Sequence, residues 1–361
     1  MKTRKIGIDA RLYFQTGVGT YIRNLLYYLS LSSPNSMQFY VYVLPKDVPT
    51  IHLPPGRFTI RPVDAPWHSV GEQTVFYSAI MEDNLDLMHF TYFSYPIRYK
   101  RPFIATVHDV TPLLFKTGRA STLNPLFYEI KHQVFKFVLS SQIKHARAII
   151  TPTRSVQDQI VSMYGTSIKN KIHPLYEGVS YELMSVKENT SLSKKYPKPF
   201  YLYVGNFYPH KNVERLIEAF DNPPDLLLVG PDNMFAQKLK DHIAAANIKN
   251  ITFNHNATIE DLVFFYNHAK ALVNPSLSEG FGLPLIEATY FGCPVIASDI
   301  PVFKELLGSN YTSFDAMNVP DIAEKLKAGP RVIPDSIRNP DTSKFSFEKM
   351  TRDVVHLYNN E

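Results

Sequence analysis

Short apolar runs alternate with amphipathic segments along the whole chain. Runs of this length, bounded by turns and separated by helical stretches, are typical of buried parallel strands. In the second half, Val213, Leu216, Ile217 and Phe220 follow the i, i+3, i+4, i+7 spacing of a helix with one buried face. The pattern predicts two doubly wound α/β domains, whose strands lie in residues 5–12, 38–44, 85–90, 102–109 and 146–152, and then 200–206, 225–231, 250–254, 270–276 and 293–299.

A polar segment rich in lysine and serine, residues 177–199, separates the two sets of strands and closes with two prolines. It has the composition of a linker. We therefore expect an N-terminal domain over 1–178, a C-terminal domain over 179–343 and a final helix within 344–361. Doubly wound sheets bind ligands at the carboxyl ends of their strands, so the ligand is expected in the crevice between the domains.

The net charge of +5 is unevenly distributed. Residues 1–178 contain 20 Lys+Arg and 11 Asp+Glu, whereas residues 179–361 contain 18 and 22. A basic first half suits an anionic partner, either nucleic acid or an anionic membrane surface, although uneven solvation of an ordinary surface gives the same counts.

The chain has one cysteine, Cys293, which excludes an internal disulfide and fits a reducing compartment. Its first residues lack the apolar stretch of a signal peptide, and no run reaches the roughly 18 apolar residues of a membrane span. We expect a cytoplasmic protein.

The segment SEGFGLPLIEATYFGCPVIASD (278–299) places two carboxylates around a helix start. With Pro284 in the first turn, the backbone N–H groups just before it are unpaired and form an anion site. Glu287 lies one turn inside the helix, where a carboxylate can accept from both hydroxyls of a ribose. Glu279 precedes the helix and would face the other end of a diphosphate. The alternative is an ordinary turn, with Glu287 solvated and Glu279 an N-cap.

Lys211 follows a strand, Gly205 and a loop, and it lies where the next helix opens. Cations are disfavoured at helix N-termini unless an anion offsets them. Lys211 is therefore a candidate to neutralise a diphosphate leaving group. The alternative is a solvated lysine in a first turn.

The segments YVGNFYPHKNVERLIEAF and SEGFGLPLIEATYFGCPVIASDIPVFKEL resemble the two hallmark segments of glycosyltransferase family 4, including its glutamate–seven–glutamate motif. IGIDARLYFQTGVGTYIRNL resembles the N-terminal glycine loop of that family, and FIATVHDVTPLLF its His-Asp-x-x-Pro segment. TPTRSVQDQI and FSFEKMTRDVV also fit, so the resemblance spans nearly the whole chain. It implies a GT-B fold of two facing Rossmann-like domains, with a C-terminal helix that crosses back onto the N-terminal domain.

The resemblance also implies roles for individual residues. Lys211 would bind the diphosphate, Glu279 the hydroxyls of the transferred sugar and Glu287 the ribose. His108 would contact the donor sugar near its anomeric carbon, and the N-terminal glycines would lie against the donor phosphates or the acceptor. The implied catalytic set is Lys211, Glu279 and His108. The implied nucleotide-sugar-binding set is Gly17, Gly19, Gly205, Asn206, Phe281, Gly282, Leu283 and Glu287.

One departure from the family concerns phosphate binding. Many members have an arginine where this chain has His210 or Asn206, and a histidine is a weaker phosphate ligand. Arg215 and Lys270 are not obvious substitutes, so the source of the remaining charge compensation stays open.

Other chemistries find no support in the sequence. It contains no Asp-x-Asp, no pair of histidines at i+2 to i+4 and only one cysteine, so we expect neither a metal nor a cofactor. The dinucleotide-binding fingerprint of dehydrogenases is incomplete, because Ile22 occupies the position of its third glycine. The Gly-x-Ser-x-Gly motif of serine hydrolases does not occur.

The resemblance predicts retaining transfer of a hexose from a nucleotide-diphosphate sugar to a glycan or lipid-linked acceptor, with front-face attack. The His-Asp-Val-Thr-Pro form of the N-terminal motif favours GDP-mannose. Aromatic residues in 89–96 either stack on the acceptor or anchor a loop. Residues 124–147, with Lys131, Lys136, Lys144 and Arg147, predict contact with an anionic leaflet, which would make the protein peripheral at the inner membrane face.

Three alternatives remain open: a nucleotide-sugar epimerase, a disaccharide synthase, and a non-catalytic subunit that binds sugar nucleotides. We expect no nucleic-acid partner.

Overall fold

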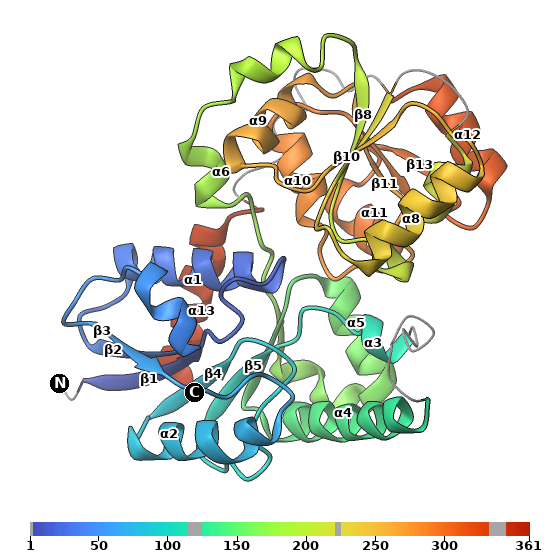
Figure 1. Cartoon of the computed structure of the whole chain (residues 1–361). Helices are drawn as coiled ribbons and strands as arrows, with labels where there is room; N and C mark the ends of the chain where they lie inside the picture. Colours follow the sequence, from blue (N-terminus) through green and yellow to red (C-terminus); the bar gives the residue numbers. More distant parts are fainter. Residues whose placement is uncertain (1–2, 115–124, 221–224, 332–343) are drawn as a thin grey trace. The chain divides into compact units, whose positions relative to one another are not determined.

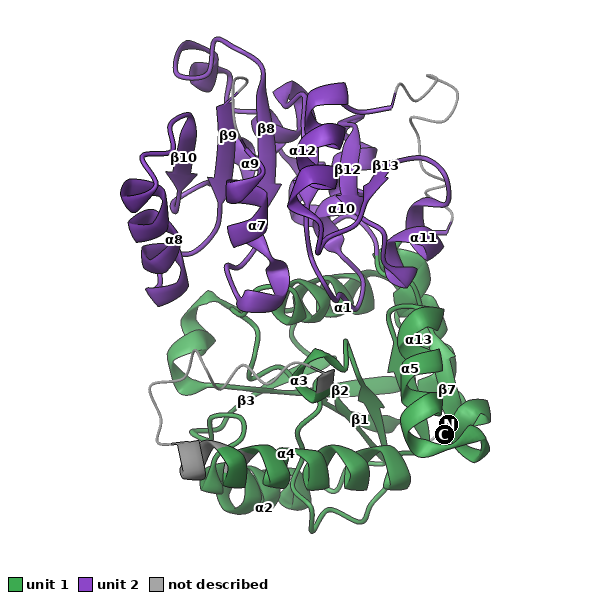
Figure 2. Ribbon diagram, turned by 90° about the vertical axis from the view of Figure 1, so that its right-hand side faces the viewer, with its two compact units in different colours: residues 1–177, 346–361 green, residues 178–345 purple. Residues whose placement is uncertain are grey.

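The computed structural model describes residues 3–114, 125–220, 225–331 and 344–361. These residues form two compact units, shown in green and purple in Figure 2. Unit 1 consists of residues 1–177 and 346–361, and unit 2 of residues 178–345. The prediction of two doubly wound α/β domains is confirmed.

Unit 1 is built on a parallel sheet of seven strands in the order β3-β2-β1-β4-β5-β6-β7. Helices α1 and α13 cover one face of the sheet, and α2 and α4 cover the other (Figure 1). The strands are β1 (Arg4–Asp9), β2 (Met37–Val43), β3 (Phe58–Pro62), β4 (Leu87–Phe90), β5 (Phe103–Thr106), β6 (Ala148–Thr151) and β7 (Ile172–Pro174). The α-helices are α1 (Val18–Ser32), α2 (Tyr77–Glu82), α3 (Thr111–Leu114), α4 (Pro125–His145), α5 (Arg154–Tyr164) and α13 (Phe347–Asn360).

The last helix, α13, packs within unit 1 although it ends the chain (Figure 2). Ser346 caps its N-terminus by accepting a hydrogen bond from the backbone N–H of Lys349. Near its other end, the hydroxyl of Tyr358 lies 2.7 Å from Nδ1 of the buried His89 in β4. Burial lowers the pKa of His89 to about 3, so this histidine stays neutral and acts as a hydrogen-bonding link between helix and sheet.

Unit 2 is built on a parallel sheet of six strands in the order β10-β9-β8-β11-β12-β13. Its strands are β8 (Phe200–Val204), β9 (Asp225–Val229), β10 (Ile251–Asn254), β11 (Ala271–Asn274), β12 (Val295–Ser298) and β13 (Thr312–Phe314). Its α-helices are α6 (Tyr181–Ser185), α7 (Val213–Glu218), α8 (Met234–Ala245), α9 (Ile259–His268), α10 (Leu283–Tyr290), α11 (Pro301–Leu307) and α12 (Val319–Ala328).

Each sheet has one point at which the strand order reverses. In unit 1 the chain winds away in both directions from β1 and β4, and in unit 2 from β8 and β11. The loops that follow such a pair of strands diverge, which leaves a crevice at the carboxyl edge of the sheet where ligands bind. Ligand sites are therefore expected in the loops after β8 and β11 and in those after β1 and β4.

Among the described residues, no helix combines the length and the apolar character that crossing a membrane requires.

Gly205 and Gly230 lie where the loops that follow β8 and β9 pass very close to each other. Gly205 has a φ of +154°, and its carbonyl oxygen passes close to Gly230, which follows β9. A Cβ atom at Gly230 would lie 2.1 Å from that oxygen, so only glycine fits there without a shift of backbone.

We predict that Gly230→Ala lowers the stability of unit 2 by about 2 kcal/mol or more, because the methyl group must displace backbone rather than a flexible side chain. Chemical denaturation with a probe in each unit measures this. Gly71→Ala is the control, because Gly71 has an ordinary helical φ of −58° and should tolerate alanine with little change. An unaltered unfolding midpoint of unit 2 in Gly230→Ala would contradict the assigned backbone contact.

Candidate functional site

The loops after β8 and β11 are bonded to each other at the reversal point of the unit 2 sheet. The backbone N–H of Leu277 donates to the carbonyl of His210 at 2.8 Å. Asn212, which is buried with a left-handed φ of +58°, donates through Nδ2 to the carbonyls of Pro275 (3.1 Å) and Ala316 (2.7 Å). Asn212 therefore joins the two loops.

Lys211 and Glu279 form a direct ion pair at this junction. The distance from Nζ to Oε1 is 2.6 Å, and the hydroxyl of Ser276 donates to the same Oε1 at 2.8 Å. The side chains are 20% and 11% exposed, so the pair is only partly screened by water. The sequence assigned the two residues to different parts of a ligand, whereas the structure pairs them with each other. A ligand anion that reaches Lys211 must compete with Glu279.

The N-terminus of α10 lies on the same loop as Glu279. Gly282 is its N-cap, with a φ of +91°, so the alternative that Glu279 is the N-cap is wrong. The backbone N–H groups of Phe281, Gly282 and Leu283 make no hydrogen bond within the described part of the chain, and the first turn has no acidic residue. The helix end thus presents unpaired donors and the positive end of its dipole. The ring of Phe281 is buried against Phe345, so Phe281 can contribute only its backbone.

Glu287 lies inside α10 and is 8% exposed, which rules out the alternative of a solvated helix residue. Its Oε2 accepts a hydrogen bond of 2.6 Å from the hydroxyl of Tyr266 in α9. Burial raises the pKa of Glu287 to about 7, and the bond from Tyr266 only partly offsets this effect. No donor in the described residues reaches Oε1, so one carboxylate oxygen remains for a ligand hydroxyl.

His108 belongs to unit 1, two residues after β5. Its Nε2 lies 3.0 Å from the carbonyl of Thr91, and its Nδ1 lies 3.4 Å from Oε1 of Glu177. Both ring nitrogens therefore lie close to oxygen atoms that can accept a hydrogen bond. Tyr21 of α1 packs its ring edge-on against His108 at 4.9 Å.

The sequence did not identify Glu177 as a candidate site residue, because it opens the polar segment that we interpreted as a linker. The structure buries it, at 4% exposure. A carboxylate next to a buried histidine fixes the orientation of the ring.

The two N-terminal glycines occupy different environments. Gly17 is exposed and forms the N-cap of α1, with a φ of +55°. Gly19 is buried, and a Cβ there would lie 2.6 Å from the carbonyl oxygen of Tyr13. The loop after β1 therefore packs so closely at this position that it leaves no room for a side chain.

Neither Arg215 nor Lys270 replaces the arginine that the family often has. Arg215 donates through Nη1 to Oδ1 of Asn212 at 2.7 Å and holds that side chain in place. Lys270 directly precedes β11, at the amino edge of the sheet, and lies over the ring of Tyr201. The carbonyl of Asn206 accepts a bond from the hydroxyl of Tyr203, which stabilises the turn after β8. Of these three cations in the described part of the chain, Lys211 is the one that pairs with the loop leading into α10, through Glu279.

Comparison with known proteins identifies both units. The family model described as Glycosyltransferase Family 4 matches residues 16–183, and the model described as Glycosyl transferases group 1 matches residues 187–328. Together they account for most of unit 1 and unit 2. The chain belongs to the family 4 glycosyltransferases.

Two curated relatives are bacterial mannosyltransferases. The chain is 32% identical over 225 residues to the O-antigen chain mannosyltransferase RfbU of Salmonella typhimurium, which covers 60% of this chain and 62% of that protein. It is 33% identical over 244 residues to a serotype-specific mannosyltransferase WbdA of Escherichia coli, covering 61% of this chain but 29% of that protein. The chain thus spans less than two thirds of either relative.

Solved structures show the same fold. The sucrose-phosphate synthase of Thermosynechococcus elongatus has a TM-score of 0.74 at 17% identity, covering 99% of this chain and 98% of that one. WaaG, a glycosyltransferase involved in lipopolysaccharide biosynthesis, has a TM-score of 0.63 at 16% identity, covering 99% and 95%. The fold is GT-B, as predicted.

We predict that Glu287→Gln stabilises the protein above neutral pH. The pKa of Glu287 rises from 4.5 to about 7 on folding, so folding takes up a proton in this window and the free energy of unfolding falls as the pH rises through it. Removing the charge should raise the free energy of unfolding by about 1–3 kcal/mol at pH 8 and leave it unchanged below about pH 4. Denaturation of both proteins across this range measures the difference. A difference in stability between the variant and the wild type that is the same at pH 4 and pH 8 would contradict the burial of a charge at this position.

Proposed function

We propose that this protein transfers a hexose from a nucleotide-diphosphate sugar to a hydroxyl of a glycan or lipid-linked acceptor, with retention of the anomeric configuration. The observation that carries the proposal is the position of the Lys211–Glu279 pair. The pair lies beside the unpaired N–H groups of α10, at the reversal point of the unit 2 sheet. Family membership supports the reaction class.

The charges of the site suit a pyrophosphate leaving group. Lys211 and the N-terminus of α10 supply positive potential where negative charge develops as the bond to the anomeric carbon breaks. Glu279 then holds hydroxyls of the transferred sugar, and Oε1 of Glu287 accepts from the ribose. Among the residues placed here, no carboxylate is assigned as a nucleophile, so we propose front-face attack with the leaving diphosphate as base. Because Lys211 supplies the charge, the proposal needs neither a metal nor a cofactor.

We further propose that the donor is GDP-mannose. The curated relatives named above are mannosyltransferases, and the His-Asp-Val-Thr-Pro motif of the chain favours the same donor. A thermal-shift comparison of GDP-mannose, UDP-glucose and UDP-galactose tests the choice, because a ligand at 100 times its dissociation constant adds about 2.7 kcal/mol of stability. A larger shift with either UDP-sugar would overturn the choice of donor and leave the reaction class standing.

Direct assay of the product separates transfer from the alternatives. An epimerase would consume the donor with no acceptor present, a disaccharide synthase would use a free small sugar, and a binding subunit would shift in melting temperature without turnover.

We predict that Lys211→Ala and Glu279→Ala each lower the transfer rate by about 10²–10³ while the fold is retained. The double variant distinguishes function from structure. If both residues contact the donor, removing both leaves the enzyme inactive, whereas a purely structural pair would allow the double variant to regain activity, because no unpaired charge would remain.

Lys325→Ala is the matched control for that experiment. Lys325 pairs with Glu324 at 2.9 Å on the surface of α12 in the same unit, and its loss should leave transfer unchanged. Transfer near the wild-type rate in Lys211→Ala or Glu279→Ala would refute the assigned roles.

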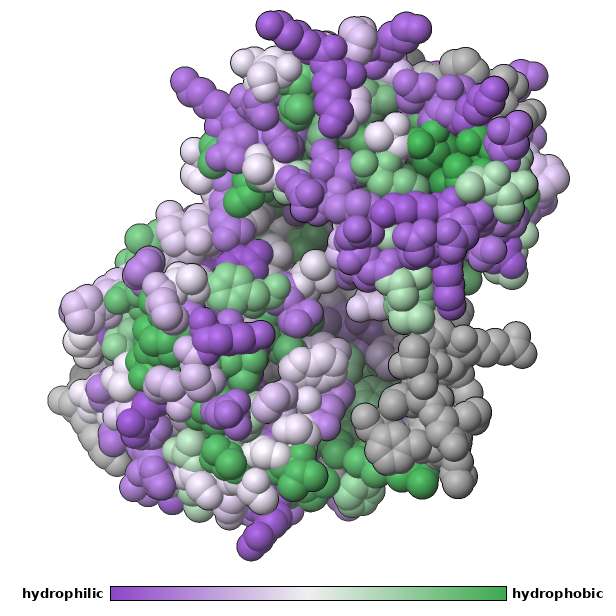
Figure 3. All heavy atoms as spheres, in the orientation of Figure 1, coloured by the Kyte–Doolittle hydropathy of each residue, from purple (hydrophilic) through white to green (hydrophobic). Residues whose placement is uncertain are grey.

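The acceptor proposal includes docking of unit 1 on an anionic membrane surface through α4. Ile130, Val134 and Phe137 are 53%, 54% and 62% exposed, and their i, i+4, i+7 spacing places them on one face of the helix. Lys136 and Lys144 lie on the same helix and Arg147 follows its end, whereas the side chain of Lys131 lies outside the described residues. In Figure 3, apolar side chains are visible on unit 1, while hydrophilic ones dominate unit 2. An exposed apolar stripe with lysines suits an interfacial helix.

We predict that the protein sediments with vesicles of anionic lipid and that Val134→Ser with Phe137→Ser reduces the bound fraction several-fold, because less apolar area enters the lipid interface. The control is Tyr27→Ser with Leu31→Ser, which changes two exposed apolar residues on one face of α1. Wild-type protein that stays in the supernatant, or an equal loss in both double variants, would refute docking through α4.

A further inference from the structure

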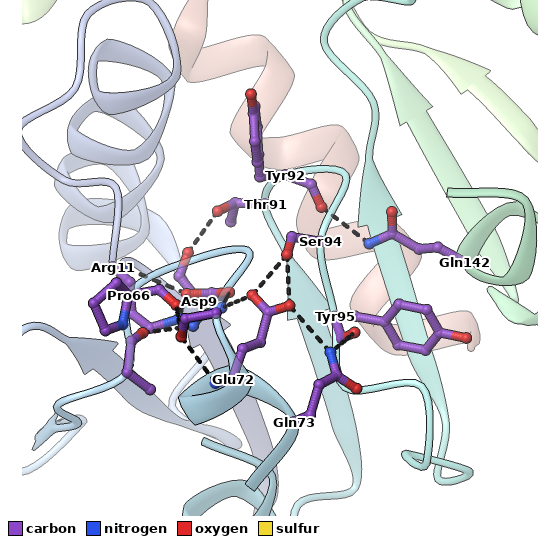
Figure 4. A network of polar contacts seen from close by, with 12 residues as sticks. Asp9, Arg11, Pro66, Glu72, Gln73, Thr91, Tyr92, Ser94, Tyr95 and Gln142 are labelled. Atoms are coloured by element: carbon purple, nitrogen blue, oxygen red, sulfur yellow. Dashed lines mark hydrogen bonds and ion pairs between the residues drawn. The ribbon is translucent and has the colours of Figure 1, made fainter. Parts of the chain in front are cut away.

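The reversal point of the unit 1 sheet contains a buried network of charges that the donor-binding residues of unit 2 do not explain. Arg11 donates through Nε and Nη2 to Asp9 at 2.8 Å and 2.7 Å, and through Nη2 to Glu72 at 3.0 Å. The hydroxyl of Ser94 donates to the same glutamate at 2.6 Å. All four side chains are buried, and Figure 4 shows them converging below the loop that carries Tyr92.

This network anchors the loop that follows β3. Arg11 donates through Nη1 to the carbonyl of Ala65 at 2.8 Å. Since β2 and β1 separate β3 from β4, a segment that starts at β3 must pass over two strand ends, roughly 14 Å at the usual spacing, to reach β4. Arg11 holds this crossing segment against the carboxyl edge of the sheet.

The network also anchors the loop that follows β4. Thr91 donates its hydroxyl to the carbonyl of Asp9, and Gln142 of α4 donates to the carbonyl of Tyr92 at 2.9 Å. With the bond from Ser94 to Glu72, three successive points of the loop are fixed. In Figure 4 the ring of Tyr92 points away from this network.

Aromatic side chains from the two anchored loops meet at the surface. The ring of Trp67 lies 5.8 Å from that of Tyr92 at an angle of 80° and 4.7 Å from that of His68. Phe93 packs beneath, 3.8 Å from Tyr92, and is buried. Trp67 is 39% exposed, and its indole N–H has no hydrogen-bond partner in the described part of unit 1. His68 is exposed and held at a φ of +56°, a conformation that costs energy for a residue with a side chain.

We propose that Trp67 and Tyr92, whose rings meet nearly at right angles, form a platform at which a neutral pyranose ring of the acceptor glycan stacks on one ring and contacts the other. This inference rests on the proposed function and names the acceptor subsite. Aromatic faces are electron-rich and suit the C–H face of a sugar, while the indole N–H is placed to donate to a hydroxyl. The buried network contains two carboxylates for one guanidinium, so it favours an uncharged sugar over a phosphate group.

The anchoring explains why such a platform would bind sugars. Weak stacking contributes to affinity only when little conformational freedom is lost on binding, and both loops are fixed before any ligand arrives. A tryptophan that only covered the network would instead be expected to bury its ring and pair its N–H.

Trp67 is the only tryptophan of the chain, so its fluorescence reports on this surface alone. We expect an α-linked mannotriose, maltotriose or chitotriose to produce a saturable change in the emission of the full-length protein, with at least one of the three active. Tyr92→Ala should weaken the binding of that trisaccharide about 10-fold. No emission change with any of the three would overturn the proposal.

Kinetics with the transfer assay separate binding from structure. Trp67→Ala should raise the KM for acceptor about 10-fold with kcat and the donor-induced thermal shift unchanged, and Trp67→Phe should restore most of the loss. Val70→Ala is the control, because Val70 is 80% exposed on the same loop. A fall in kcat and melting temperature with no change in KM would identify Trp67 as a structural cover and refute the platform.

Failure of the platform and failure of the proposed function give different results. Lys211→Ala should keep the full change in emission on adding the trisaccharide, since Lys211 belongs to the donor site in unit 2. If no donor is turned over but the emission change persists, the platform stands as a glycan site and the transferase proposal fails. If transfer occurs but Trp67→Ala leaves the KM for acceptor unchanged, the platform alone fails.

Discussion

The ion pair between Lys211 and Glu279 is the interaction on which the proposed donor site depends. It brings together two loops that are 68 residues apart in the chain, and it does so at the one place in unit 2 where the strand order reverses. In the absence of a ligand, each charge neutralises the other. A diphosphate next to the unpaired N–H groups of α10 would draw Lys211 towards itself and leave Glu279 available for the hydroxyls of a sugar. The pair thus keeps both groups in position without leaving a half-buried charge uncompensated.

Glu287 shows that this site is obtained at a cost in stability. An ionised carboxylate is disfavoured where it is buried, and a single hydroxyl from Tyr266 does not compensate for the lost water. Ligand hydroxyls would supply the missing donors. The residue is therefore better suited to a bound nucleotide than to the free protein, which is a common feature of binding sites.

The two units use the same topological feature with different chemistry. In unit 2 the reversal point displays a cation and a helix terminus, which suit an anion. In unit 1 the buried charges around Arg11 face inward and fix two loops, while the surface above them is aromatic. The first arrangement suits a phosphate and the second a neutral ring, as expected for an enzyme whose two substrates differ in charge.

The sequence by itself determined the two doubly wound domains, because short apolar runs alternate with helical segments. It also located Lys211 and Glu279 on loops between strand and helix, and Glu287 inside the helix that follows. The strands β3, β7 and β13 were not predicted, since edge strands are short and half exposed and their apolar pattern is weak. Only the tertiary structure decided which polar groups meet. The pairing of Lys211 with Glu279, the burial of Glu177 and Glu287, and the approach of Trp67 to Tyr92 all depend on residues that are distant in the chain. Local sequence patterns carry no information on such long-range contacts.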